Sequence, residues 1–134
     1  MPISLLREQH LALCRPVGLL NAELVEWLLI YTSKLENAAA EPFNRFIDLS
    51  DLLEIKLSHA ELCEIAQARR YALQHVAPFR TAILAPNALS AAVARMYEVL
   101  MDGGPAEIRV FRDADGAADW LQVPVQTLLQ AESA

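Results

Sequence analysis

The sequence is poor in glycine and cysteine, and both shortages argue against particular classes of site. With four glycines in 134 residues, it contains neither G-x-x-x-x-G-K-[ST] nor G-x-G-x-x-G, so no phosphate-cradling loop is predicted. The two cysteines, Cys14 and Cys63, have no motif spacing, which favours buried thiols in a reducing cytosol. No G-x-S-x-G elbow occurs and the three histidines lie far apart, so no nucleophilic triad is predicted. We therefore expect a non-enzymatic protein without a cofactor.

Clustered positive charge and long apolar runs are also lacking. Lysine and arginine number 11 against 17 acidic residues, a net charge of −6, and Arg69 and Arg70 are the only adjacent basic pair. Nucleic-acid binding normally requires a clustered basic surface, so that class is not predicted. The densest apolar run, residues 27–31, is far shorter than the roughly 18 residues of a membrane span, and the first ten residues do not resemble a signal peptide. These features predict a cytoplasmic protein without stable membrane insertion.

The sequence is rich in apolar residues. Hydrophobic residues make up 54% of the chain and the mean hydropathy is positive, enough for a sizeable core. The charged fraction of 21% is low for a globular protein and leaves some apolar surface for a partner. The length suits one domain, which we expect to cover residues 1–122. Residues 123–134 are expected to form a C-terminal tail, as a loose turn or frayed.

Short apolar runs alternate with helical patterns along the chain. A hairpin is predicted within residues 3–15, followed by strands at 43–49, 80–85 and 108–111. Helices are predicted after Asn21 to about residue 36, from Ser58 to about 75, after Asn87, and after Asp113 or Asp115 through 121. This order favours an α/β fold with a mixed, mainly parallel sheet of four or five strands flanked by about four helices.

The helical spacing of apolar residues predicts which faces of the first three helices are buried. The predicted buried residues are Leu24, Trp27, Leu28, Tyr31 and Leu35 in the first helix, Leu62, Ile65, Ala66, Ala72 and Leu73 in the second, and Leu89, Val93, Met96, Tyr97 and Leu100 in the third. Arg69 interrupts the second face. We expect its side chain to extend past the edge of the core into solvent.

Polar residues around the end of strand 43–49 and the start of the next helix form the candidate site: Asp48, Ser50, Asp51, Ser58 and His59. The carboxylate of Asp48 either caps loop amides or faces a crevice at the strand end. Ser58 begins a capping box with Glu61, where the helix N-terminus also favours an added phosphate. His59 and Cys63 share a helix face, but a metal needs three or four ligands, so no metal site is predicted.

Three stretches resemble SpoIIAA-like domains, of the STAS-like fold group that includes anti-sigma factor antagonists. RPVGLLNAELVEWLLI (15–30) is similar to that family's strand, glycine and amphipathic helix. FIDLSDL (46–52) resembles its hydrophobic strand ending in Asp-Leu-Ser, and IRVFRDADGAADWL (108–121) its closing strand and helix. The resemblance implies one SpoIIAA-like/STAS-like α/β domain spanning most of the chain.

The resemblance implies a regulatory protein-interaction module of the bacterial cytosol. Its partner would be another protein, such as an anti-sigma-type kinase, or a second copy in a homodimer. The antagonists carry a phosphorylated serine in an Asp-Ser-Ser-Gly motif at a helix start. Here Lys56, Leu57, Ser58 and His59 occupy those positions, which leaves Ser58 as the candidate phospho-acceptor.

The same fold group is compared with CRAL-TRIO lipid-binding domains, whose cavity takes an apolar ligand. The alternative function is therefore a small apolar-ligand or lipid-binding domain. An interaction module predicts an exposed apolar patch beside the helix after Ser58, without a deep pocket. A ligand-binding domain predicts an enclosed apolar pocket.

Overall fold

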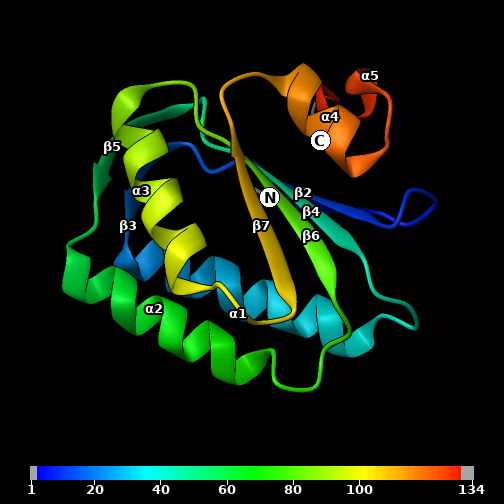
Figure 1. The fold of residues 1–134 in the computed structure, drawn as a ribbon, viewed down its shortest axis with the longest axis horizontal. Helices are drawn as coiled ribbons and strands as arrows, with labels where there is room; N and C mark the ends of the chain where they lie inside the picture. Colours follow the sequence, from blue (N-terminus) through cyan, green and yellow to red (C-terminus); the bar gives the residue numbers. More distant parts are fainter. Residues whose placement is uncertain (1–2, 131–134) are drawn as a thin grey trace.

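The computed structural model describes residues 3–130, which fold around a five-stranded sheet in the order β1-β2-β4-β6-β7 (Figure 1). The strands are β1 (Ile3–Leu6), β2 (Leu11–Cys14), β4 (Asn44–Asp48), β6 (Phe79–Leu84) and β7 (Ala106–Phe111). β1 and β2 form the predicted antiparallel hairpin, and the other pairs are parallel. The α/β class and the mixed, mainly parallel sheet are therefore confirmed.

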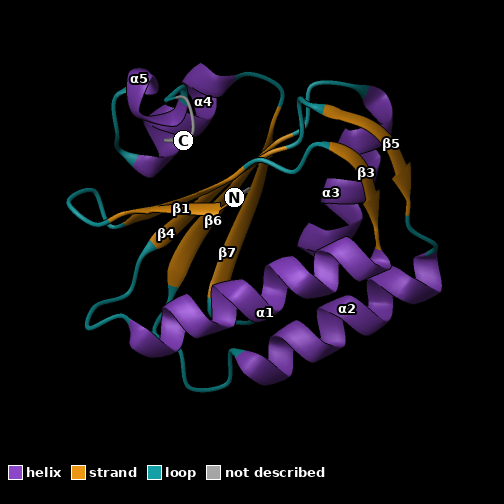
Figure 2. Ribbon diagram, turned by 180° about the vertical axis from the view of Figure 1, so that it is seen from behind, coloured by secondary structure: helices purple, strands orange, loops and turns teal. Residues whose placement is uncertain are grey.

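Helices cover both faces of this sheet (Figures 1 and 2). The three long ones, α1 (Ala22–Ala38), α2 (His59–Ala72) and α3 (Ala88–Leu100), lie on one face, and α4 (Ala114–Leu121) and the short α5 (Val125–Leu128) lie on the other. None of the helices within residues 3–130 is long and apolar enough to cross a membrane.

Side-chain alternation along the strands divides the core between these two faces. On β4, the fully buried Phe46 packs on the α4–α5 side with Leu13 and Leu121. Its neighbours Arg45 and Ile47 point the opposite way, toward α1–α3. The chain therefore encloses two separate interiors, and one of them contains an arginine on a central strand.

A second, two-stranded parallel sheet pairs β3 (Gly18–Asn21) with β5 (Leu52–Lys56). It lies beside α3, apart from the main sheet (Figure 1). The sequence predicted no strand at these positions, because each strand is short and has no alternating pattern. Gly18 supplies a φ of +80°, which turns the chain into β3 where most other residues would be strained.

The predicted helix starts are confirmed by their caps. Asn21 accepts a hydrogen bond from the Leu24 amide at 2.9 Å, Ser58 forms its capping box, and Asn87 caps α3. Of the two candidates for the last helix, Asp113 is the cap, because its carboxylate accepts from the Gly116 amide at 2.8 Å.

Helix α2 ends earlier than predicted. Its last residue is Ala72, with Leu73 as the C-cap, whereas the sequence predicted an end near residue 75. Ala72 itself is exposed rather than buried, while Leu73 is completely buried. The helix therefore stops as soon as its last core residue is in place.

The predicted apolar faces of α1 and α3 are only partly correct. Trp27 is 43% exposed and stacks on Tyr31 at the surface, with ring centroids 5.7 Å apart. Leu89 is 59% exposed, while the small Ala91 and Ala94 are buried against the sheet. Small residues allow a helix to approach a sheet closely, so the contact face is centred on the alanines rather than on the largest side chains.

The packed part of the chain extends past the expected domain boundary at residue 122. Leu128 of α5 is completely buried in the core formed with Phe46 and Leu121. The Arg15 guanidinium donates hydrogen bonds to the carbonyls of Leu128 and Gln130. Burial of an apolar side chain thus fixes residues 123–130, whereas 131–134 of the expected tail lie outside the described residues.

Candidate binding cavity

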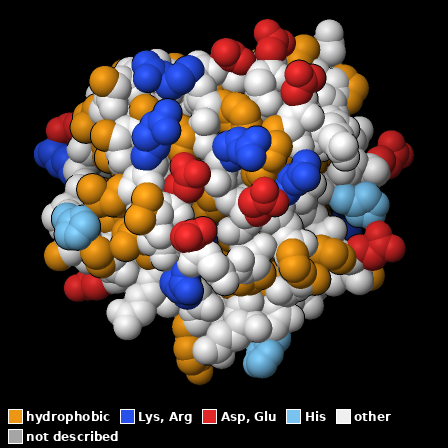
Figure 3. Space-filling model, in the orientation of Figure 1, with side chains coloured by type: hydrophobic (Ala, Val, Ile, Leu, Met, Phe, Trp, Pro, Cys, Tyr) orange, Lys and Arg blue, Asp and Glu red, His pale blue; other side chains and the backbone are white. Residues whose placement is uncertain are grey.

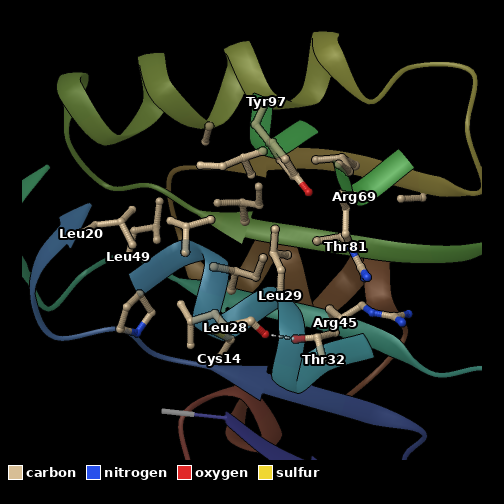
Figure 4. A pocket seen from close by; sticks show the side chains of 18 of the residues that line it. Cys14, Leu20, Leu28, Leu29, Thr32, Arg45, Leu49, Arg69, Thr81 and Tyr97 are labelled. Atoms are coloured by element: carbon tan, nitrogen blue, oxygen red, sulfur yellow. Dashed lines mark hydrogen bonds between the residues drawn. The ribbon is translucent and has the colours of Figure 1, made fainter. Parts of the chain in front are cut away.

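A cavity of about 150 Å³ lies between the sheet and helices α1–α3 (Figure 4). All five strands of the main sheet and the three long helices contribute to its wall. Its apolar lining residues are Ile3, Ala12, Cys14, Pro16, Leu20, Val25, Leu28, Leu29, Ile47, Leu49, Leu57, Leu62, Ile65, Phe79, Ile83, Val93, Ala94, Ala106 and Ile108. The polar ones are Thr32, Arg45, Arg69, Thr81 and Tyr97.

The cavity exists because short side chains face it from both layers. Ala12 on β2, Ala94 on α3 and Ala106 on β7 are all buried lining residues. Protein interiors normally leave few voids larger than a water molecule. An apolar cavity of roughly this size stays dry and can hold a molecule such as benzene. The interior on this side of the sheet is therefore large enough for a small organic ligand.

Charged side chains gather at one end of the cavity. Leu20 and Leu49 lie at the opposite end from Arg45 and Arg69 (Figure 4). The Arg69 guanidinium donates two hydrogen bonds, of 2.8 and 2.6 Å, to the carboxylate of Glu36. Arg45 donates to the same carboxylate. The three side chains are only 4–7% exposed, so β4, α1 and α2 meet in a buried ionic cluster.

This Glu36–Arg45–Arg69 cluster carries unbalanced charge. Two guanidiniums face one carboxylate, a formal excess of one positive charge. Burial lowers the pKa of Arg45 to about 10, with Arg69 acting in the same direction and Glu36 opposing it. Burial also raises the pKa of Tyr97, whose hydroxyl points toward Arg69 in Figure 4. With a pKa of about 10, Arg45 is still charged at neutral pH.

Arg45 is held by aromatic rings as well as by Glu36. Its guanidinium lies 3.4 Å from the ring centroid of Phe79 and 4.2 Å from that of Phe43, close enough for cation–π attraction. Its Nη1 donates to the Phe43 carbonyl. Its Nε is the one buried side-chain nitrogen or oxygen without a hydrogen-bond partner among residues 3–130. Arg45, which contributes to the cavity lining, therefore keeps one hydrogen-bond donor unused.

The expectation that Arg69 reaches solvent is wrong: the residue is 5% exposed and paired with Glu36. Sequence reasoning also missed Glu36 and Arg45 as site residues. The available signals were two charged residues in apolar surroundings: Arg69 on an apolar helix face and Arg45 inside the aromatic strand at 43–49. The partner of both arginines is Glu36, which lies 9 residues from Arg45 and 33 residues from Arg69 in the sequence.

The predicted residues at the end of β4 have a structural role or lie at the surface. The Asp48 carboxylate accepts from the Ser50 amide at 2.9 Å and pairs with Arg15 at 3.5 Å. It therefore caps the loop, one of the two predicted alternatives. Ser50 and Asp51 are exposed in the turn between β4 and β5.

Ser58 and His59 lie exposed at the start of α2. The five residues of β5 separate them from Ser50 and Asp51, a span of about 16 Å, so the predicted residues do not form one cluster. The two ring nitrogens of His59 face different atoms, Met96 Sδ at 3.1 Å and Cys63 Sγ at 3.5 Å. Within residues 3–130, no three His, Cys, Asp or Glu side chains are placed to hold a metal ion.

An exposed apolar surface lies on the side of the molecule that carries Ser58 and His59 at the start of α2 (Figures 1 and 3). Hydrophobic side chains gather at the left of Figure 3, where Figure 1 shows β5, α3 and the start of α2. Exposed apolar residues of these elements include Leu53, Leu89 and Met96. The structure therefore has both the apolar surface and the apolar pocket that the sequence set up as alternatives.

Comparison with known proteins bears on the fold alone. No protein-family model matches the sequence, and no curated protein matches it. The structure is similar to the crystal structure of an uncharacterized protein of the DUF3478 family from Shewanella loihica PV-4, described as having a SpoIIAA-like fold. The match has a TM-score of 0.57 and covers 89% of this chain and 91% of that chain. This chain has a SpoIIAA-like fold.

The fold match confirms the resemblance inferred from the three sequence stretches. Sequence identity to the Shewanella protein is 23%, which supports a common architecture and no transfer of activity. The description of that protein assigns it no ligand or reaction. Function must therefore be argued from the SpoIIAA-like domain's own cavity and surface.

Proposed function

We propose that this SpoIIAA-like domain is a non-enzymatic cytoplasmic binding protein for a small, largely apolar organic molecule. The observation that carries the proposal is the cavity of about 150 Å³ between the sheet and α1–α3. Ligand sites are typically concave and apolar, with a few polar groups that fix orientation. Here Thr32, Thr81 and Tyr97, with the two arginines, are those groups.

Cavity size limits the class of ligand. Sites for drug-sized molecules usually measure about 300–1,000 Å³, so this cavity suits a single ring or a short branched chain. The best small ligands gain at most about 1.5 kcal/mol per non-hydrogen atom. For a ligand of seven non-hydrogen atoms, such as toluene, this ceiling is about 10 kcal/mol, so its Kd would be no tighter than on the order of 10 nM.

Filling the cavity tests the proposal. Ala94 lines the cavity and is 3% exposed, whereas Ala92 on the same helix is exposed. Toluene is expected to shift NMR signals of cavity-lining methyl groups in the unmodified protein. Ala94→Leu inserts an isobutyl group into the cavity and is expected to weaken toluene binding by at least about tenfold. The matched variant Ala92→Leu should bind toluene as the unmodified protein does.

Two results would count against the proposed function. One is an unmodified protein whose cavity signals do not move at saturating toluene. The other is equal toluene affinity in Ala94→Leu and Ala92→Leu, which would locate binding elsewhere.

The protein-interaction module is the second candidate function. It is supported by the exposed Leu53, Leu89 and Met96 on the side of β5 and α3, and by the exposed Ser58 at the start of α2. A kinase partner would add one phosphate to Ser58, which intact-mass analysis and peptide mapping of protein from its own host would detect. Homodimers would be detected by equilibrium sedimentation. A monomer without phosphate on Ser58 would count against both the kinase-regulated module and the homodimer.

A further inference from the structure

Building on the proposed function, we infer that the ligand is a small organic monocarboxylate whose carboxylate lies against Arg45 and Arg69. Its apolar part would extend toward Leu20 and Leu49 at the opposite end of the cavity (Figure 4). The inference rests on the charge, the hydrogen-bonding capacity and the size of this one site.

The cavity wall offers positive charge and no negative charge. Arg45 and Arg69 are the charged residues among those that line it, and Glu36 pairs with both without lining it. One carboxylate therefore balances one of two guanidiniums. A buried charge is costly unless it is paired, and the remaining positive charge fits one monoanion. A phosphate dianion would reverse the imbalance rather than remove it.

The hydrogen bonds point to the same class of ligand. Arg45 Nε is buried without an acceptor among the described residues, and a guanidinium fork matches the two oxygens of a carboxylate. A neutral carbonyl could accept from Nε but would leave the excess charge in place. A carboxylate supplies both the acceptor and the charge.

Cavity volume then restricts the apolar part. About 150 Å³ holds a ring of roughly the size of benzene, which excludes the long chain of a membrane lipid or fatty acid. Benzoate combines one such ring with one carboxylate and is the natural probe. Toluene and benzamide are its neutral counterparts of nearly the same shape.

Calorimetric titration of the unmodified protein at neutral pH tests the inference directly. Benzoate is expected to bind at least about tenfold more tightly than benzamide, because hydrogen bonds to charged groups are worth about 1.5–3 kcal/mol. Arg69→Met leaves one arginine paired with one glutamate and is expected to abolish the preference for benzoate while toluene binding persists. Arg70→Met removes the same charge from an exposed neighbouring position and should leave the preference intact.

Failure of the inference and failure of the proposed function give different results. Toluene binding with no preference for benzoate over benzamide would overturn the monocarboxylate and leave the apolar-ligand function standing. Absence of binding by all three probes would overturn the function itself. Competition by chloride as effective as that by benzoate would show a site for inorganic anions and would also overturn the inference. The comparison of benzoate with benzamide needs no variant, so it stands even if Arg69→Met fails to fold.

Discussion

Replacing Glu36 with glutamine is expected to lower the free energy of unfolding by about 3–5 kcal/mol. The substitution keeps the size of the side chain but removes the negative charge shared by Arg45 and Arg69. Two guanidiniums with side chains 5–7% exposed would then repel each other with no counter-ion. Domains are stable by about 5–15 kcal/mol in total, so Glu36→Gln is expected to remove a large fraction of the stability. Urea denaturation monitored by circular dichroism would measure the loss.

The exposed ion pair of Glu54 and Lys56 provides the matched control. Its atoms are 3.5 Å apart, but the side chains are 55% and 65% exposed, and such pairs contribute about 0–1 kcal/mol. Glu54→Gln should therefore change stability very little. Adding Arg69→Met to Glu36→Gln is expected to restore part of the lost stability, because one of the repelling charges is removed. Equal losses for Glu36→Gln and Glu54→Gln would contradict the buried ionic cluster.

Leu128→Ala is expected to destabilise the protein by about 2–5 kcal/mol. Leu128 is completely buried against the sheet face that carries Phe46, so truncation leaves a void in the core beneath α4 and α5. The size of this loss measures how far residues 123–130 belong to the folded domain. Thermal and urea unfolding of the variant would report it.

The neighbouring Leu129 is 61% exposed and supplies the control on the same short helix. Leu129→Ala is expected to change stability by no more than about 0.5 kcal/mol. If Leu128→Ala behaved in the same way, α5 would contribute no more to stability than a loosely attached tail. A large difference between two adjacent leucines can arise only from tertiary packing.

The sequence predicted the main architecture because the relevant signals are local. The hairpin of β1 and β2, the strands β4, β6 and β7, and the caps Asn21 and Ser58 depend on residues within a few positions of one another. The three resembling stretches added the SpoIIAA-like fold, which the similarity to the Shewanella protein confirms. Where the local signal was weak, as at β3 and β5, the prediction failed, because their pairing joins Gly18 to Leu52.

The candidate site was much less predictable. Asp48 and Ser58 were conspicuous in the sequence because they occupy strand and helix ends, and the structure gives both of them local capping bonds. Arg69 interrupts an otherwise apolar helix face, Glu36 lies near the predicted end of the first helix, and Arg45 lies within the predicted strand at 43–49. Their burial follows from where α1, β4 and α2 meet, and no spacing within one element encodes that meeting.

The sequence by itself determined the order along the chain of the five main-sheet strands and the four longer helices, the helix starts and the α/β class. Backbone hydrogen bonds, caps and side-chain periodicity act over a few residues, so they can be read along the chain. Tertiary structure decided which charges are buried together, how much space the alanines leave between the sheet and α1–α3, and that Leu128 belongs to the core. Those properties depend on contacts between residues far apart in the chain, which form only when the whole domain packs.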